Sequence, residues 1–235
     1  MAEANQEYCQ TVLREHDEDR WLTVQYAAPA RQRTLSALYA FQYEVNRIPS
    51  VVSEPPLGEI RLQWFREALG EIRAGARVRD HPVVQEIAAC GLADDVYARL
   101  LDGVINAASR RLYGDEFTGF DDFLGWYERC YGAIDAAALG VCQGPAEFVE
   151  MVQRAGAYYA IAREANLRNA DIVQQARENF SKSWPSLSKD LARLPAPAMP
   201  AVLALFLTPT YLKQAGKPFP MRKRLILLRA MAIGR

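Results

Sequence analysis

The chain of 235 residues contains no two aspartates three or four positions apart. That spacing places two carboxylates on one face of a helix, so an aspartate pair sharing a metal ion across one helical turn is excluded. The chain has only two histidines and no Gly-x-Ser-x-Gly motif to mark a serine nucleophile. A Gly-x-Gly-x-x-Gly motif or a P-loop, which would bind phosphate, is also absent. The sequence therefore lacks the common signatures of hydrolases and nucleotide-binding enzymes.

Cysteine is scarce and scattered along the chain. Its four positions are Cys9, Cys90, Cys130 and Cys142, without a Cys-x-x-Cys motif or a zinc-site spacing. We expect free thiols in a reducing compartment, mostly as small buried side chains. The N-terminus is polar and acidic, unlike a secretory signal, and four prolines interrupt the longest uncharged stretch, residues 194–212. We predict a cytoplasmic protein, with a peripheral position at a membrane surface as the alternative.

Acidic residues are absent from the C-terminal end of the chain. The last is Asp190, whereas residues 1–20 contain six acidic residues against two arginines. The formal net charge is nevertheless zero, so we expect no binding to nucleic acid. Two roles are open for the basic, amphipathic segment 219–233: packing as the last helix, or contact with a protein partner or an anionic membrane surface. The basic residues considered for that contact are Arg222, Lys223, Arg224 and Arg229.

Apolar residues recur every three or four positions through almost the whole chain, and no stretch alternates as a half-buried strand does. Prolines and glycines mark the ends of the periodic stretches. We predict an all-α fold in a single domain, residues 1–235, in which 1–14 form a loose extension of the first helix. The expected helices cover residues 5–27, 31–48, 56–73, 82–90, 93–112, 120–142, 145–179, 183–193, 198–214 and 219–233.

Acidic pairs at helical spacing do occur, at Glu3/Glu7, Glu15/Asp19 and Glu67/Glu71. Because charged side chains are mostly exposed, we interpret all three pairs as solvated helix faces. From these residues we expect no metal site and no bound cofactor.

Several short motifs, in order and spacing, resemble the squalene/phytoene synthase family over roughly residues 15–212. They are Asp19-Arg20-Trp21-Leu22, residues 31–41 (RQRTLSALYAF), His81-Pro82-Val83-Val84, Leu100-Leu101-Asp102-Gly103, residues 127–132 (YERCYG), residues 138–144 (ALGVCQG) and Gly156-Ala157-Tyr158. The resemblance implies an isoprenoid-synthase-type helical bundle around a central cavity. It also implies two aspartate-rich motifs, which in the enzymes hold Mg²⁺ on a prenyl diphosphate.

Both aspartate-rich motifs are degenerate in this chain. At the first, Asn46 and Ser50 stand at the two aspartate positions, Arg47 lies beside them, and Pro49 should disrupt the helix. At the second, Arg163 stands where an asparagine is usual and Leu167 where the first aspartate is usual, while Asp171 retains the second. The Arg-x-Tyr-Leu-Pro segment that follows in the enzymes is absent, which predicts a bundle shortened in its C-terminal half.

Residues 44–64 resemble most closely the non-catalytic branch of the family that contains the mitochondrial complex I assembly factors. If Arg47 and Arg163 point inward, they place positive charge where the enzymes bind cations, which disfavours Mg²⁺. An isoprenoid cavity and ordinary core packing are both open for Tyr39, Tyr43, Glu44, Tyr158 and Tyr159.

Three functions follow from these features. The leading hypothesis is a non-catalytic assembly, scaffold or lipid-associated factor descended from a prenyl synthase. The alternative is a Mg²⁺-dependent transferase that joins two prenyl diphosphates, with Glu44, Asn46 and Asp171 as a remnant metal site. The third is a carrier of an isoprenoid lipid.

Overall fold

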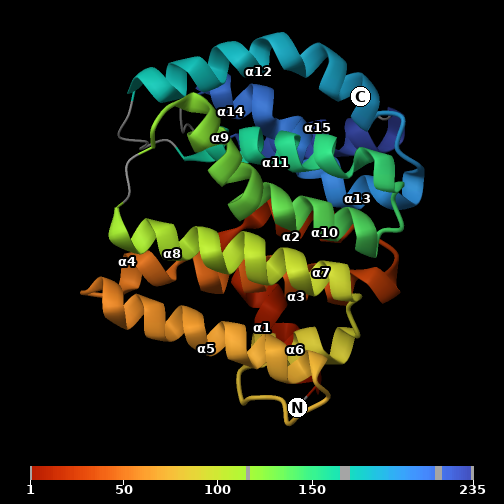
Figure 1. The fold of residues 1–235 in the computed structure, drawn as a ribbon. Helices are drawn as coiled ribbons and strands as arrows, with labels where there is room; N and C mark the ends of the chain where they lie inside the picture. The colour runs from red at the N-terminus through yellow and green to blue at the C-terminus, as the bar shows by residue number, and fades with distance from the viewer. Residues whose placement is uncertain (1, 115–116, 165–169, 215–218, 234–235) are drawn as a thin grey trace.

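The computed structural model describes residues 2–114, 117–164, 170–214 and 219–233, and all regular secondary structure in them is helical (Figure 1). The first part comprises α1 (Ala2–His16), α2 (Glu18–Val24), α3 (Pro29–Asn46), α4 (Ile48–Val51), α5 (Pro55–Arg73) and α6 (Pro82–Cys90). The middle part comprises α7 (Asp94–Ala98), η1 (Arg99–Ile105), α8 (Asn106–Tyr113), α9 (Phe120–Tyr127), η2 (Glu128–Gly132) and α10 (Ala133–Val141). The last part comprises η3 (Ala146–Phe148), α11 (Val149–Arg163), α12 (Ala170–Leu191), η4 (Ala196–Ala198), α13 (Met199–Val202), η5 (Leu203–Leu207), α14 (Thr208–Gln214) and α15 (Pro220–Ile233). The predicted all-α fold is confirmed.

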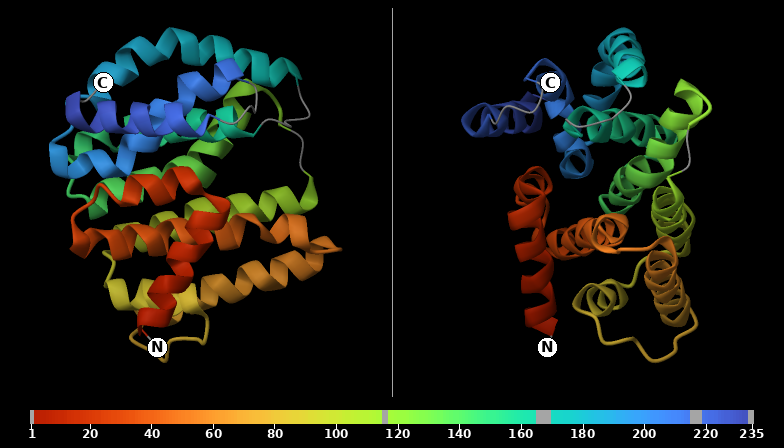
Figure 2. Two further views of the ribbon diagram at one scale, coloured as in Figure 1. Left: turned by 180° about the vertical axis from the view of Figure 1, so that it is seen from behind. Right: turned by 90° about the vertical axis from the view of Figure 1, so that its left-hand side faces the viewer.

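The helices form two packed groups. In Figure 1, α1 and α3 to α6 make up the lower half, and α9 to α15 make up the upper half with α12 across the top. Helix α1 packs against α3 and α6, while α11 packs against η2, α10, α12 and α14. In the end view of Figure 2 the last helix lies at the outer edge of the upper half.

The N-terminal residues are part of this packing. Residues 1–14 are expected from the sequence to be loose, but from Ala2 onward they form α1, whose Cys9, Val12 and Leu13 are buried in the main hydrophobic core. The predicted helix 5–27 is interrupted at Asp17, which has φ −144° and accepts a hydrogen bond from the backbone N–H of Arg20 at 3.4 Å. Asp17 is thus the N-cap of α2. The change of chain direction at this cap brings α2 to the cavity described below.

The predicted break between the helices 145–179 and 183–193 is wrong, because α12 runs from Ala170 to Leu191 and continues through Pro185. A proline removes one helical hydrogen bond, but the side chains around it hold the helix in place. The rings of Phe180 and Trp184 stack at 5.0 Å between centroids, and Leu187 is buried in the second core cluster. The predicted helix 145–179 is likewise divided, since α11 ends at Arg163 and α12 begins at Ala170.

Two predicted helices, 93–112 and 120–142, do run without a break in the structure. Each contains one wider π-helical turn, η1 and η2, and these two turns pack against each other. A π-helical turn shifts the register of the side chains that follow it, and such turns are frequent at functional sites. In η2 the turn carries Cys130 and Tyr131 toward the centre of the molecule.

Candidate functional site

A cavity of about 320 Å³ lies between the α1–α2 junction, α3, α8, η2 and α11. Its lining is polar and aromatic, with four arginines. The lining residues are His16, Asp17, Arg20, Tyr39, Gln42, Tyr43, Asn46, Arg47, Arg111, Tyr131, Tyr159, Ala160, Arg163 and Glu164. This is the position expected for the central cavity of an isoprenoid-synthase-type bundle.

The floor of the cavity is a buried ion pair between Arg20 in α2 and Asp135 in α10. Nη2 of Arg20 lies 2.5 Å from Oδ1 of Asp135. The guanidinium is also placed over the rings of Tyr39 and Tyr159, at 4.7 and 5.0 Å from their centroids. Burial opposes the charge of Arg20, but Asp135 together with Tyr39, Tyr159 and Asp17 outweighs it and raises the arginine pKa. Burial raises the pKa of Asp135 to about 6, against the opposing effect of Arg20.

Gly156 in α11 gives Asp135 the space that it occupies. A Cβ atom at position 156 would lie 2.2 Å from Oδ2 of Asp135, closer than van der Waals contact permits. The glycine therefore lets α10 and α11 approach closely at the point where the buried carboxylate lies.

Arg163 spans the opening between α11 and the α2 cap. Its Nη1 donates to Oδ1 of Asp17 at 2.9 Å and to the hydroxyl of Tyr159 at 3.1 Å. Its Nε lies 3.8 Å from Oδ2 of Asp19. The carboxylates that face this part of the cavity are therefore already neutralised by a cation that belongs to the chain.

Asp19 is the centre of a wider network. Its Oδ2 accepts hydrogen bonds from the hydroxyls of Tyr159 at 2.7 Å and Tyr211 at 2.5 Å. Its Oδ1 lies 2.6 Å from Nζ of Lys223 in α15. Burial favours the neutral acid, but Arg163 and Lys223 outweigh it and lower the pKa of Asp19. The interpretation of Glu15/Asp19 as a solvated face fails for Asp19, which is fully buried.

Lys223 is therefore not part of the basic surface to which it was assigned from the sequence. Its side chain is buried, and its ammonium also donates to Oε2 of Glu18 at 2.6 Å. Arg222, Arg224 and Arg229 of the same helix are exposed. Of the four basic residues considered for a contact surface on α15, only these three are exposed.

The residues of the first degenerate motif do not lie together. Asn46 lines the cavity, where its Oδ1 accepts from the thiol of Cys130 at 3.3 Å and its buried Nδ2 has no hydrogen-bond partner among the described residues. Arg47 lines the cavity too, and its Nε lies 3.2 Å from Oε2 of Glu44. Ser50 is exposed and donates to the carbonyl of Arg47 at 2.7 Å, away from the lining.

The residues of the second motif are also dispersed. Arg163 lines the cavity, Leu167 lies outside the described residues, and Asp171 is exposed in the first turn of α12. Glu44, which the enzymatic alternative places with Asp171 and Asn46, is buried outside the lining and accepts a hydrogen bond from Tyr8 at 2.7 Å. The remnant metal set is therefore not brought together around the cavity.

The candidate lipid-binding tyrosines divide into two groups. Tyr39, Tyr43 and Tyr159 line the cavity. Tyr158 belongs to the second core cluster, where its ring meets that of Phe180 at 5.5 Å. Core packing thus accounts for Tyr158, and the cavity accounts for the other three.

Sequence reasoning missed the far wall of the cavity. Oε2 of Glu164 accepts from the hydroxyl of Tyr127 at 2.6 Å, and Oε1 accepts from that of Tyr131 at 2.8 Å. Tyr131 in turn accepts from Nη1 of Arg111 at 3.2 Å. The only signal for this wall is the spacing of the two tyrosines, four positions apart within residues 127–132.

The donor set does not fit Mg²⁺. This ion requires several free oxygen ligands in octahedral geometry, whereas Asp17 and Asp19 face Arg163, and Glu164 is used by two tyrosines. Within residues 2–114, 117–164, 170–214 and 219–233, no three histidine, cysteine or acidic side chains are grouped so as to hold a metal ion. Nor does any helix of these ranges have the length and apolar character needed to cross a membrane.

Known proteins match both the sequence and the fold. The complex I assembly factor 6 of Mus musculus is 23% identical and that of Rattus norvegicus 24% identical, each over 88% of this chain and 72% of its own length. A dehydrosqualene synthase solved with a ligand superposes with a TM-score of 0.73 over 98% of this chain and 96% of that one. At 10% identity this second match shows the fold alone. The first two are consistent with the assembly-factor branch expected from the sequence.

A family model described as squalene/phytoene synthase matches residues 13–161, more than half of the chain. The matched range includes most of the residues that line the cavity. The chain therefore belongs to the squalene/phytoene synthase family.

Proposed function

We propose that this protein is a non-catalytic member of the family that uses the synthase fold as a scaffold in the assembly of another protein complex. The observation that carries the proposal is the position of Arg163, whose guanidinium contacts Asp17 and Asp19 in the cavity. An internal cation bound to the local carboxylates leaves no ligands for a metal–diphosphate complex. In this proposal the fold is retained without free ligands for a metal ion. Retention of the fold is then explained by selection for the shape and surface of the protein rather than for turnover of a substrate.

The relatives support the assembly role. Two curated relatives carry names that describe assembly factors of complex I, and they match 88% of this chain. Transfer of that role is our proposal, and the client complex of this chain is to be identified by experiment.

Titration calorimetry with farnesyl diphosphate, with and without Mg²⁺, tests the loss of catalysis. We expect no Mg²⁺-dependent binding and no coupled product, while a dehydrosqualene synthase in the same buffer serves as the active control. Mg²⁺-dependent turnover by the pure protein would refute the proposal and restore the prenyl-transferase alternative. In that case Asp171→Ala should abolish the activity if the remnant metal site is real.

Loss of the gene in the source organism tests the assembly role. We expect a multi-subunit complex to stall as a subcomplex on native gels, and the tagged full-length protein to co-purify with that subcomplex. Complementation by an Arg163→Ala variant would separate the scaffold role from the cavity, since the change alters the cavity and its opening and leaves the exposed residues of the other helices in place. A normal complement of mature complexes in the deletion strain would contradict the role.

A second candidate, an isoprenoid carrier, is favoured by the tyrosines that line the cavity. The substitution Ala160→Phe would fill part of the space next to Tyr159. If the carrier hypothesis holds, mass spectrometry of a solvent extract should find an isoprenoid with the wild type and less of it with the variant. An extract free of lipid in both proteins removes this candidate.

A further inference from the structure

Helix α15 carries an apolar ridge on its outer side. Met221, Leu225 and Leu228 follow one another at intervals of four and three residues, so they form one stripe along the helix. Their side chains are 72%, 65% and 56% exposed. The opposite side of α15, which carries the buried Leu227, packs on η5. The ridge is thus a row of large apolar side chains that the described residues leave uncovered.

The surroundings of the ridge are positively charged. Arg222, Arg224 and Arg229 are exposed on the same helix. Beside it, a groove of about 850 Å³ runs between α15 and the end of α12, and Lys189 and Arg193 complete its basic lining. None of the lining residues is acidic.

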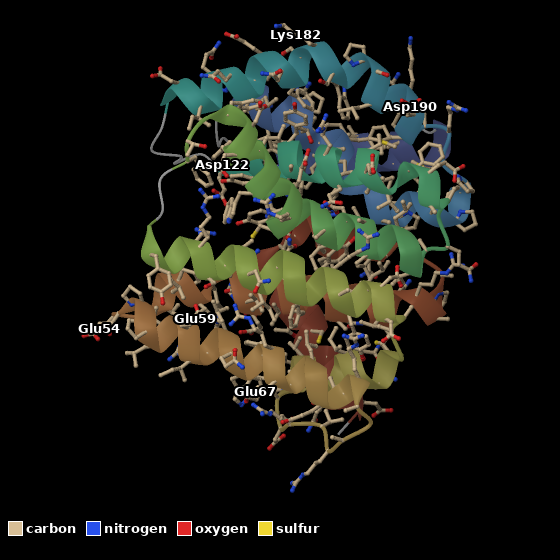
Figure 3. The ribbon with its side chains drawn as sticks, viewed as in Figure 1. Glu54, Glu59, Glu67, Asp122, Lys182 and Asp190 are labelled. Atoms are coloured by element: carbon tan, nitrogen blue, oxygen red, sulfur yellow. The ribbon has the colours of Figure 1, made fainter. Side chains whose placement is uncertain are left out.

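The floor of this groove is apolar. Trp184 of α12, Phe206 of η5 and Ile226 of α15 contribute to it. One carboxylate beside the groove is that of Asp190, whose Oδ1 lies 3.6 Å from Nη1 of Arg193. Figure 3 shows Asp190 near the end of α12. A cationic rim above an apolar floor matches a molecule that has an anionic head and an apolar body.

A second apolar patch on the molecule provides the contrast. Val51, Leu57 and Ile60 in α4 and α5 are 52%, 48% and 67% exposed. Glu54 and Glu59 lie along the same helix start, far from α12 in Figure 3. Exposed apolar side chains therefore occur in two places, with acidic and basic residues mixed around the first and only basic charged residues lining the groove beside α15.

We propose that the α15 face docks on the surface of a bilayer that contains anionic phospholipids. A convex ridge of large apolar side chains flanked by arginines is the pattern of helices that lie in the membrane interface. The ridge enters the boundary between headgroups and acyl chains, the three arginines of α15 contact phosphates, and the adjacent groove receives a single lipid.

Flotation of the full-length protein with vesicles tests this proposal. We expect binding to vesicles of phosphatidylcholine mixed with phosphatidylglycerol, and little binding to phosphatidylcholine alone. Raising the salt concentration should weaken the binding, because screening shortens the range of the attraction. Equal binding to both vesicle types, or no binding to either, would overturn the proposal.

Paired variants locate the surface. Arg222→Gln/Arg229→Gln should lower the partition coefficient on the order of 10- to 30-fold, because each arginine near the surface contributes about 1 kcal/mol, or roughly fivefold. Leu225→Ser/Leu228→Ser should lower it at least tenfold. The matched controls, Arg61→Gln/Arg77→Gln and Leu57→Ser/Ile60→Ser, change equally exposed residues and should leave binding unchanged. If the control pairs reduce binding as much as the α15 pairs do, the contact is nonspecific and the assignment fails.

Discussion

Nη2 of Arg20 and Oδ1 of Asp135 are 2.5 Å apart in the interior, with side chains only 3% and 0% exposed. The pair joins α2 to α10 below the cavity, and two tyrosine rings enclose the guanidinium. Removing two charges from water is costly, so the pair is stable only while both partners are present.

Replacing Asp135 with alanine should destabilise the protein by roughly 3–5 kcal/mol, because Arg20 is then left buried without its partner. Urea unfolding measures this loss. The control Asp94→Ala removes an aspartate whose pair with Arg73 is exposed, so it should change stability by about 1 kcal/mol or less. The double variant Arg20→Met/Asp135→Leu should be more stable than Asp135→Ala. A loss below 1 kcal/mol in the single variant would contradict this account.

Gly156→Ala should destabilise the protein by about 1–3 kcal/mol, because the new methyl group overlaps Oδ2 of Asp135 and must push α10 away from α11. The matched control is Gly70→Ala in α5, where an added Cβ meets nothing within 4 Å. There alanine should stabilise the helix by about 0.5–1 kcal/mol. Thermal denaturation of both variants therefore gives shifts of opposite sign. A Gly156→Ala variant at least as stable as the wild type would mean that the close approach at position 156 has no cost.

Asp19 should make stability fall in acid. Its folded pKa is lowered, so its contribution is complete above the ordinary value of 3.8 and is lost as the pH falls through the folded value. Asp19→Asn should cost about 1.5–3 kcal/mol at pH 7. The difference between variant and wild type should narrow as the pH falls below 3.8, as followed by urea unfolding. Asp135, whose pKa is raised, has the opposite effect but is present in both proteins. A difference that stays constant with pH would exclude this role of the Asp19 carboxylate.

The cysteines should react slowly in the folded protein. Cys9, Cys130 and Cys142 are buried, and burial raises the pKa of Cys9 to about 12 and that of Cys142 to about 11. Since the thiolate is the reactive form, iodoacetamide at pH 8 should modify Cys90 first, the one partly exposed thiol. Peptide mass spectrometry identifies the order, and denaturant should make all four react. Early labelling of Cys130 would show that the cavity opens in solution.

Local features of the sequence were enough to predict many helices. Pro82 and the left-handed Gly91 fix the ends of α6, which agrees with the predicted 82–90. Pro185 misled the prediction because packing of Trp184 and its neighbours outweighs the lost hydrogen bond.

The residues of the site were harder to predict from the sequence than the helices, for a physical reason. Asn46, Arg47 and Arg163 could be chosen from the family pattern, and they do line the cavity. Asp17 stands 146 positions from Arg163, and no periodicity connects residues so far apart. Asp19 was misjudged because its burial depends on hydroxyls and an ammonium from three later helices.

The bond between Lys223 and Glu18 spans 205 positions of the chain. During synthesis, α2 therefore leaves the ribosome long before the ammonium that neutralises Glu18 and Asp19 in its first turn has been made. Until α14 and α15 arrive, Asp19 has neither Tyr211 nor Lys223 beside it, and water must solvate its charge. The charge network around Asp19 can be completed only after residue 223 has been made, which makes α15 the timing element for this part of the fold.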